Sequence, residues 1–157
     1  MPYGAAGSAK MDGSFKYNVN SGTTASIAAG EPVTKVAGAA TVLTMATNGP
    51  TTTARIVGVS TSASNETASA AGTVDIVPAN PGQIWLIAPN VAATWNTQAK
   101  YNALCGARVL IDKTAGAYTI LAADGASNGC IVEYLDISRY PGMVAFSWSP
   151  VCDYRNV

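Results

Sequence analysis

The sequence predicts a mainly β protein, either a β-sandwich or a β-barrel, with one short helix and an extended N-terminal arm. From Ile27 onward, short apolar runs alternate with turn residues at the spacing of an all-β domain. Several runs have period two, and only one segment has helical spacing. The predicted organisation is an arm over residues 1–24, a β-rich globular domain over residues 25–149 and a C-terminal tail over residues 150–157.

The first half of the domain is a series of short predicted strands. Residues 29–33 have the composition of a turn that enters a strand, and residues 41–47 alternate before Asn48-Gly49-Pro50 ends the run. Residues 55–60 are the next apolar run. The polar residues 60–71 predict a surface loop, and residues 72–77 alternate like a half-buried strand.

Residues 83–88 are apolar on both faces of the predicted strand. Both faces of such a strand have to be covered, either inside a sandwich or by another subunit. The sequence leaves both arrangements open.

The only predicted helix spans residues 96–106. Asn96 or Thr97 can cap its first turn, and Gly106 stands where a left-handed residue ends a helix. The four apolar runs that follow, at residues 108–111, 118–121, 130–135 and 143–148, predict a meander of antiparallel strands.

Charge is scarce in this chain. Only 11% of the residues are charged, the net charge is zero and there is no histidine. Histidine is the usual proton shuttle near neutral pH, and nucleic-acid binding depends on a basic surface. The composition therefore argues against an enzyme and against a nucleic-acid partner. The long uncharged stretch at residues 36–54 is broken by Gly, Pro, Asn and Thr, so no membrane span is predicted.

No cofactor and no metal site are predicted. A Ser, Thr or Cys nucleophile lacks a histidine base, and a pair of catalytic carboxylates would have to come from Glu31, Glu66, Asp75, Asp112, Glu133 and Asp136. Cys105, Cys130 and Cys152 have no metal-ligand spacing and are predicted to be free thiols, with an intermolecular bridge from Cys152 as the alternative.

Large apolar and aromatic side chains are the candidates for contacts with other molecules. In strands, such residues are more often core or interface anchors than a platform for sugar rings. The candidate interface residues are Tyr3, Phe15 and Tyr17 in the predicted arm, and Ile84, Trp85, Leu86, Trp95 and Trp148 in the domain.

Four segments together carry a family resemblance: Ala-Gly-Glu-Pro-Val at residues 29–33, Gly-Thr-Val-Asp-Ile at residues 72–76, Gln-Ile-Trp at residues 83–85, and the stretch over residues 98–111. From about Ile27 to Trp148 the chain resembles the capsid decoration, or cement, proteins of tailed bacteriophages. The resemblance implies a small β-rich protein that binds the outside of an icosahedral head, often as a trimer, and bridges neighbouring capsid subunits. It implies no catalytic residues.

The leading interpretation is therefore a virion structural protein, made in the host cytoplasm and located on the capsid exterior. Its expected partners are the major capsid protein and further copies of itself, with a trimer favoured. The alternative interpretation is a fibre-like adhesin or a carbohydrate-binding module, for which the Ser, Thr and Asn-rich loops and the aromatic residues would argue.

Overall fold

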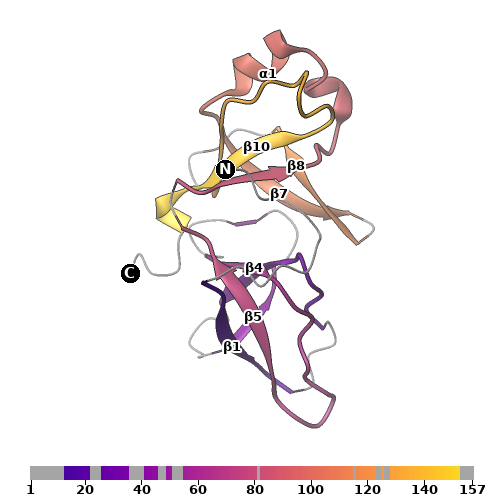
Figure 1. The fold of residues 1–157 in the computed structure, drawn as a ribbon, viewed down its shortest axis with the longest axis vertical. Helices are drawn as coiled ribbons and strands as arrows, with labels where there is room; N and C mark the ends of the chain where they lie inside the picture. Colours follow the sequence, from indigo (N-terminus) through magenta and orange to yellow (C-terminus); the bar gives the residue numbers. More distant parts are fainter. Residues whose placement is uncertain are drawn as a thin grey trace.

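The fold is mainly β, as the sequence predicts. The computed structural model describes residues 13–21, 26–35, 41–45, 49–50, 55–80, 82–114, 116–122, 125 and 128–152. Within these residues the chain forms two lobes stacked along the long axis of the molecule (Figure 1). We call residues 13–80 the barrel and residues 82–152 the second sheet.

The barrel closes on itself. Its strand order is β1-β3-β2-β4-β5, and β1 completes the ring by pairing antiparallel with β5 and parallel with β3. The strands are β1 (Phe15–Val19), β2 (Pro32–Lys35), β3 (Thr41–Thr44), β4 (Ile56–Ser60) and β5 (Gly72–Pro78). Small aliphatic side chains fill the interior: Val19, Ile27, Val33, Val42, Val57, Val74 and Ile76.

Part of the predicted N-terminal arm is a strand of the barrel. Phe15–Val19 forms β1 and pairs with β5 from Phe15 opposite Ile76 to Val19 opposite Gly72. Val19 is buried and Tyr17 packs against the barrel core, which holds this segment against its own chain. Residues 1–12 and 22–24 of the predicted arm lie outside the described residues.

Gly58 allows β4 and β5 to approach closely. A Cβ atom at this position would overlap the carbonyl oxygen of Val77 and would lie 2.7 Å from Cγ2 of Ile76. The neighbouring pairing of β2 with β4 shifts its register between Val33 and Thr34, an irregularity that increases strand twist and helps a small sheet to close. The barrel therefore depends on a residue without a side chain at Gly58.

The second sheet has the strand order β6-β10-β9-β7-β8. Its strands are β6 (Ile84–Ile87), β7 (Arg108–Thr114), β8 (Ala117–Leu121), β9 (Cys130–Val132) and β10 (Val144–Trp148). The predicted meander is wrong in one respect, because β9 pairs with β7 and not with β8. The outer edge of β8 is already occupied: Ile120 donates to Ala88 O at 3.0 Å and accepts from Asn90 N at 2.9 Å.

The predicted helix is confirmed as α1 (Gln98–Leu104). Thr97 caps its N-terminus by accepting a hydrogen bond from Lys100 N at 3.3 Å, and Gly106 follows its end with φ +82°. Two short 3-10 helices complete the described elements, η1 (Ala92–Thr94) and η2 (Pro150–Cys152). The predicted tail thus begins with a helical turn, and residues 153–157 lie outside the described residues.

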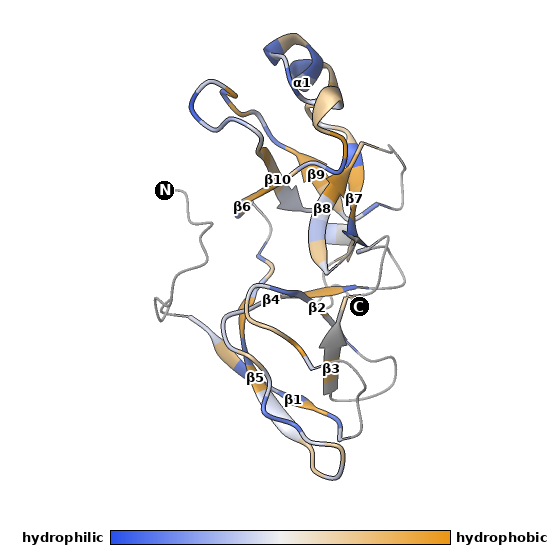
Figure 2. Cartoon of the chain, turned by 90° about the vertical axis from the view of Figure 1, so that its right-hand side faces the viewer, coloured by the Kyte–Doolittle hydropathy of each residue, from blue (hydrophilic) through white to orange (hydrophobic). Residues whose placement is uncertain are grey.

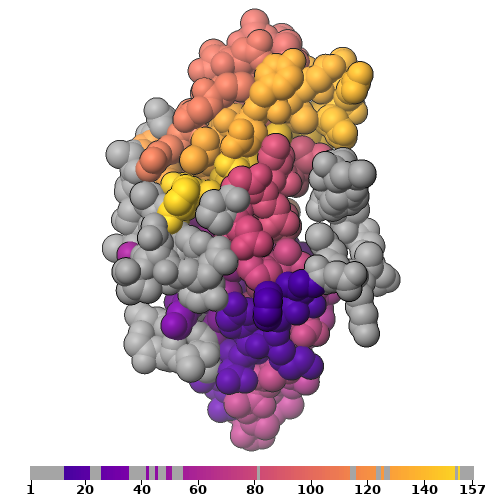
Figure 3. Space-filling model, turned by 60° about the vertical axis from the view of Figure 1, so that its left-hand side comes forward, coloured from indigo at the N-terminus to yellow at the C-terminus, as the bar shows by residue number. Residues whose placement is uncertain are grey.

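The two lobes share a core. Met45, Ile56 and Ala79 of the barrel belong to the same buried cluster as the side chains of the second sheet. Gly49 forms an antiparallel bridge with Ile111 on β7, with hydrogen bonds of 3.0 and 2.7 Å. Figure 3 shows the lobes in direct contact, with the indigo barrel strands below and the orange and yellow second sheet above.

Charged and aromatic groups reinforce the same junction. Lys113 on β7 donates to Glu31 beside β2 at 2.7 Å, and its ammonium group lies 5.0 Å from the centre of the Tyr118 ring. Tyr118 in turn donates its hydroxyl to Met45 O at 3.1 Å. These contacts fix the orientation of the barrel relative to the second sheet.

Candidate functional site

Trp95 and Trp148, two of the predicted interface residues, belong to the buried core of the single chain. Trp148 is 1% exposed and packs edge-on against Phe146, with ring centroids 4.8 Å apart, and against Trp85 at 6.2 Å. Trp95 is 5% exposed and packs against Tyr101 at 5.6 Å. The aromatic partners of both rings lie within the chain itself.

The Tyr101 side chain connects α1 to β10 and to the residue that follows β9. Its hydroxyl accepts a hydrogen bond from Ala145 N at 2.8 Å and donates to Glu133 O at 3.0 Å. Burial raises the pKa of Tyr101 to about 12, so the phenol is neutral at physiological pH. The role of this side chain is structural.

The predicted interface residues of the N-terminal region lie on β1 where the structure describes them. Phe15 is 60% exposed and lies at the first position of the strand, whereas Tyr17 is half-buried against the barrel core. Tyr3 lies outside the described residues. Of the two described residues, Phe15 is the more exposed and the more available for contact.

The predicted residues Ile84, Trp85 and Leu86 lie on β6, the edge strand of the second sheet. Ile84 is 53% exposed, while Trp85 and Leu86 are half-buried and pack against the core. Figure 2 shows β6 as a hydrophobic strand at the margin of the second sheet. The chain thus gives this apolar strand only partial cover.

Other exposed apolar side chains escaped the sequence prediction. Tyr134 is 68% exposed and Val91 is 57% exposed, and Tyr140 is also exposed. Alternation along the predicted strand 130–135 would place Tyr134 on the same buried face as Cys130 and Val132. The strand ends at Val132, however, and the phase of the alternation is lost beyond it.

A shallow depression of about 530 Å³ lies at one end of the barrel. It is lined by the uncharged residues Asn18, Val19, Asn65, Ala71, Gly72 and Thr73. None of these described lining residues carries a carboxylate, a thiol, an amine or an imidazole that could act as a base for the Thr73 hydroxyl.

Several of the predicted carboxylate candidates have structural partners. Glu31 binds Lys113, and Glu133 accepts a hydrogen bond from the Ser147 hydroxyl at 2.6 Å. Asp136 accepts hydrogen bonds from the hydroxyl and the backbone N–H of Ser138, which lower its pKa below the ordinary value. These carboxylates stabilise turns and junctions.

The cysteines are free thiols, as predicted, with Cys130 and Cys152 buried and Cys105 exposed. Burial raises the pKa of each thiol above its ordinary value, which disfavours the reactive thiolate. Within the described ranges, no cluster of His, Cys, Asp and Glu has the arrangement of a metal site. No helix among the described residues is long and apolar enough to cross a membrane.

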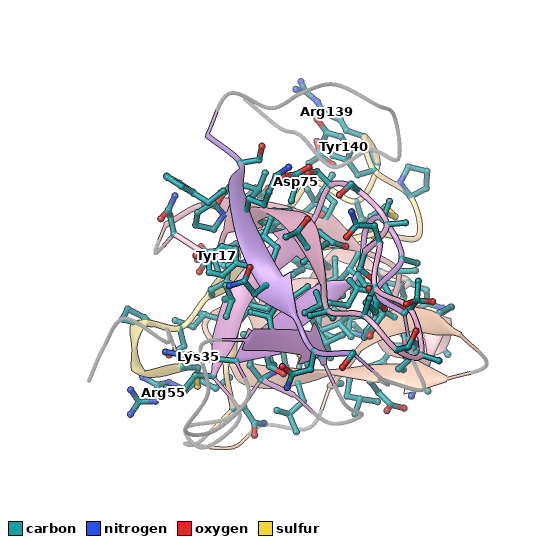
Figure 4. The ribbon with its side chains drawn as sticks, turned by 90° about the horizontal axis from the view of Figure 1, so that it is seen from below. Tyr17, Lys35, Arg55, Asp75, Arg139 and Tyr140 are labelled. Atoms are coloured by element: carbon teal, nitrogen blue, oxygen red, sulfur yellow. The ribbon has the colours of Figure 1, made fainter. Side chains whose placement is uncertain are left out.

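Three of the described cations lie on two opposite sides of the molecule in the view from below. Figure 4 shows Lys35 and Arg55 on one side of the molecule and Arg139, beside Tyr140, on the opposite side.

Comparison with known protein families finds no match to this sequence. Comparison with curated proteins finds no significantly similar sequence either. The candidate site is therefore defined by the chain's own geometry: exposed apolar side chains on a charge-poor β scaffold, concentrated on the second sheet.

Proposed function

We propose that this chain is a structural protein of a tailed-bacteriophage head, which binds the outer surface of the assembled capsid and stabilises it. The observation that carries the proposal is the distribution of side chains. Large apolar groups are exposed, whereas ionisable groups such as Glu31, Glu133 and Tyr101 are engaged in internal contacts. The resemblance of residues 27–148 to capsid decoration proteins supports the same function.

Charge scarcity suits a protein that is packed against many neighbours. Uncharged polar side chains can form hydrogen bonds across a contact without the desolvation cost of burying ions. A protein that binds only the assembled particle stabilises that particle by mass action. Because a capsid repeats the same surface many times, modest contacts at each copy add up to a large total effect.

Capsid binding tests the proposal directly. The purified protein is mixed with assembled capsids and, separately, with unassembled coat protein of the phage that encodes it, and bound protein is measured by co-sedimentation. We expect saturable, stoichiometric binding to assembled capsids only, and an increase in the temperature at which the capsids rupture. Absence of the protein from purified virions by mass spectrometry would contradict the proposal.

Two matched variants identify the lobe that docks. Phe15→Lys changes the exposed aromatic residue of the barrel, and Tyr134→Lys changes the most exposed one described on the second sheet. We expect one of these variants to weaken capsid binding at least tenfold while the other binds normally. Normal binding by both variants would show that exposed aromatic groups are not the docking contacts.

A carbohydrate-binding module or adhesin is the second candidate function. Tyr134 and Tyr140 are exposed, and exposed aromatic rings can stack on sugar rings. A glycan array distinguishes the two functions, because a decoration protein that binds capsids stoichiometrically should give no glycan signal. Glycan binding that Tyr134→Lys abolishes would favour the second candidate.

A further inference from the structure

Alternate residues of β10 form backbone hydrogen bonds with β9 and with β6. This alternation determines which backbone groups of β6 point away from the sheet. Ala145 O accepts from Glu133 N at 2.9 Å, and Ser149 N donates to Gly129 O at 2.8 Å, so the odd-numbered residues direct their backbone groups toward β9. Successive residues of a strand direct these groups to opposite sides. The even-numbered residues Val144 and Phe146 therefore direct theirs toward β6.

The register between β6 and β10 then determines which residues of β6 form hydrogen bonds with β10. Phe146 lies opposite Trp85 and Val144 lies opposite Ile87, so Trp85 and Ile87 form the hydrogen bonds with β10. Ile84 and Leu86 consequently direct their N–H and C=O groups away from the sheet. Ala88 has the same phase, and its C=O indeed accepts from Ile120 N on β8.

This contact with β8 closes only one end of the outer edge of β6. At Ala88–Asn90 the two edge strands of the curled sheet meet, but within the described part of the chain nothing pairs with the outward backbone groups of Ile84 and Leu86. Ile84–Ile87 also contains no charged residue and no proline. Soluble proteins usually protect an open edge with such residues, because an open edge is a template for pairing with another chain.

We infer that β6 pairs antiparallel with β6 of a second copy of this chain, across a two-fold axis that passes beside Trp85. In this register Ile84 lies opposite the partner's Leu86, and Leu86 lies opposite the partner's Ile84. Each of these pairs exchanges both backbone hydrogen bonds, as in any narrow antiparallel pair. The pairing joins the two five-stranded sheets edge to edge.

A second copy fits this edge because the edge is complementary to itself. The outward N–H and C=O groups belong to Ile84 and Leu86, two positions apart. A two-fold axis between these residues gives each of the groups a hydrogen-bond partner on the second copy. The strand carries no charge and the chain has a net charge of zero, so two copies approach without like-charge repulsion. Pairing also covers Ile84, which the single chain leaves 53% exposed. The inference does not rest on the proposed function.

Sedimentation velocity over a dilution series tests this pairing. The wild-type chain should be a dimer at micromolar concentration and dissociate on dilution. Ile84→Lys should weaken the dimer at least tenfold, because it places two ammonium groups beside the two-fold axis. Val91→Lys is the matched control, since it makes the same type of change at a similarly exposed apolar residue outside β6 and should leave the dimer intact.

A backbone variant separates edge pairing from a side-chain contact. Leu86→Pro removes an N–H group that faces outward and forms no bond with β10, a position at which an edge strand tolerates proline. This variant should be monomeric and retain the wild-type circular dichroism spectrum. A monomeric or trimeric wild-type chain at micromolar concentration would overturn the inference, and so would a dimer that neither Ile84→Lys nor a folded Leu86→Pro weakens.

Discussion

The barrel and the second sheet use the same secondary structure in different ways. The barrel closes its strands into a ring around Val and Ile side chains, with Tyr17 as the aromatic residue described at its core. The second sheet is built around Trp, Tyr and Phe rings, and part of its edge strand β6 remains open. The difference shows that the described strands of the barrel pair into a closed ring, whereas the second sheet keeps part of an edge open to pairing.

The largest expected effect on the stability of the barrel comes from a substitution at Gly58. In Gly58→Ala the new Cβ would overlap the carbonyl oxygen of Val77, so β4 and β5 have to separate. We expect the free energy of unfolding to fall by about 3 kcal/mol, measured by urea denaturation. Gly30→Ala is the control, because Gly30 has φ +87° but open space around it, and should cost only about 1 kcal/mol. Equal losses in the two variants would contradict the close approach at Gly58.

The aromatic core of the second sheet is most sensitive to the hydroxyl of Tyr101. Tyr101→Phe leaves Ala145 N–H and Glu133 C=O without this partner while the ring remains in place. We expect a loss of about 2 kcal/mol in the free energy of unfolding. Tyr134→Phe removes a hydroxyl from an exposed side chain and should change stability little. A neutral Tyr101→Phe would show that the hydroxyl does not hold β9, β10 and α1 together.

The same residue makes the stability of the second sheet pH-dependent. The pKa of Tyr101 is about 12 in the folded chain and 10.0 without the protein environment. The folded state therefore favours the protonated phenol, and its stabilisation is complete below pH 10 and is lost as the pH rises toward 12. Thermal unfolding of wild type and Tyr101→Phe should show a steeper alkaline loss in the wild type. Parallel curves would contradict this assignment.

The smallest expected effect concerns the ion pair at the junction of the lobes. Lys113 and Glu31 are partly exposed, and such pairs contribute less than about 1 kcal/mol. The hydrogen bond to Glu31 raises the pKa of Lys113, so the contribution is present at neutral pH and is lost in strong alkali. Lys113→Met should destabilise the chain slightly, and the difference from wild type should shrink at high salt, as measured by urea denaturation. A difference that does not depend on salt would indicate that packing against Tyr118 matters more than charge.

Local patterns in the sequence predicted many of the elements. The period-two run at residues 72–77 corresponds to β5, and the capped segment at residues 96–106 corresponds to α1. Both elements were predictable because each depends on residues that are close together in the sequence. The order of strands in the second sheet was not predictable in this way. It depends on the bonds between Ile120 and the segment Ala88–Asn90, which is distant in sequence and has no hairpin signal.

Burial was harder to predict than secondary structure. Trp85, Trp95 and Trp148 are chemically equivalent in the sequence, yet ring packing buries Trp148 and Trp95 and leaves Trp85 half-buried. Tyr134 is exposed because β9 ends at Val132, three residues before the end of the predicted strand 130–135. In both cases tertiary contacts decided the exposure, and a one-dimensional pattern does not contain them.

Residue-resolved amide hydrogen exchange, measured at high and low protein concentration, tests the difference between the closed barrel and the open second sheet most directly. The amides of Val74 and Ile76 in the barrel core, and those of Trp85 and Ile87 on the inner side of β6, should be protected at both concentrations. Those of Ile84 and Leu86 should exchange rapidly in dilute protein and become protected as the chains associate. Protection of Ile84 and Leu86 at every dilution would contradict the account, because β6 would then have no open edge.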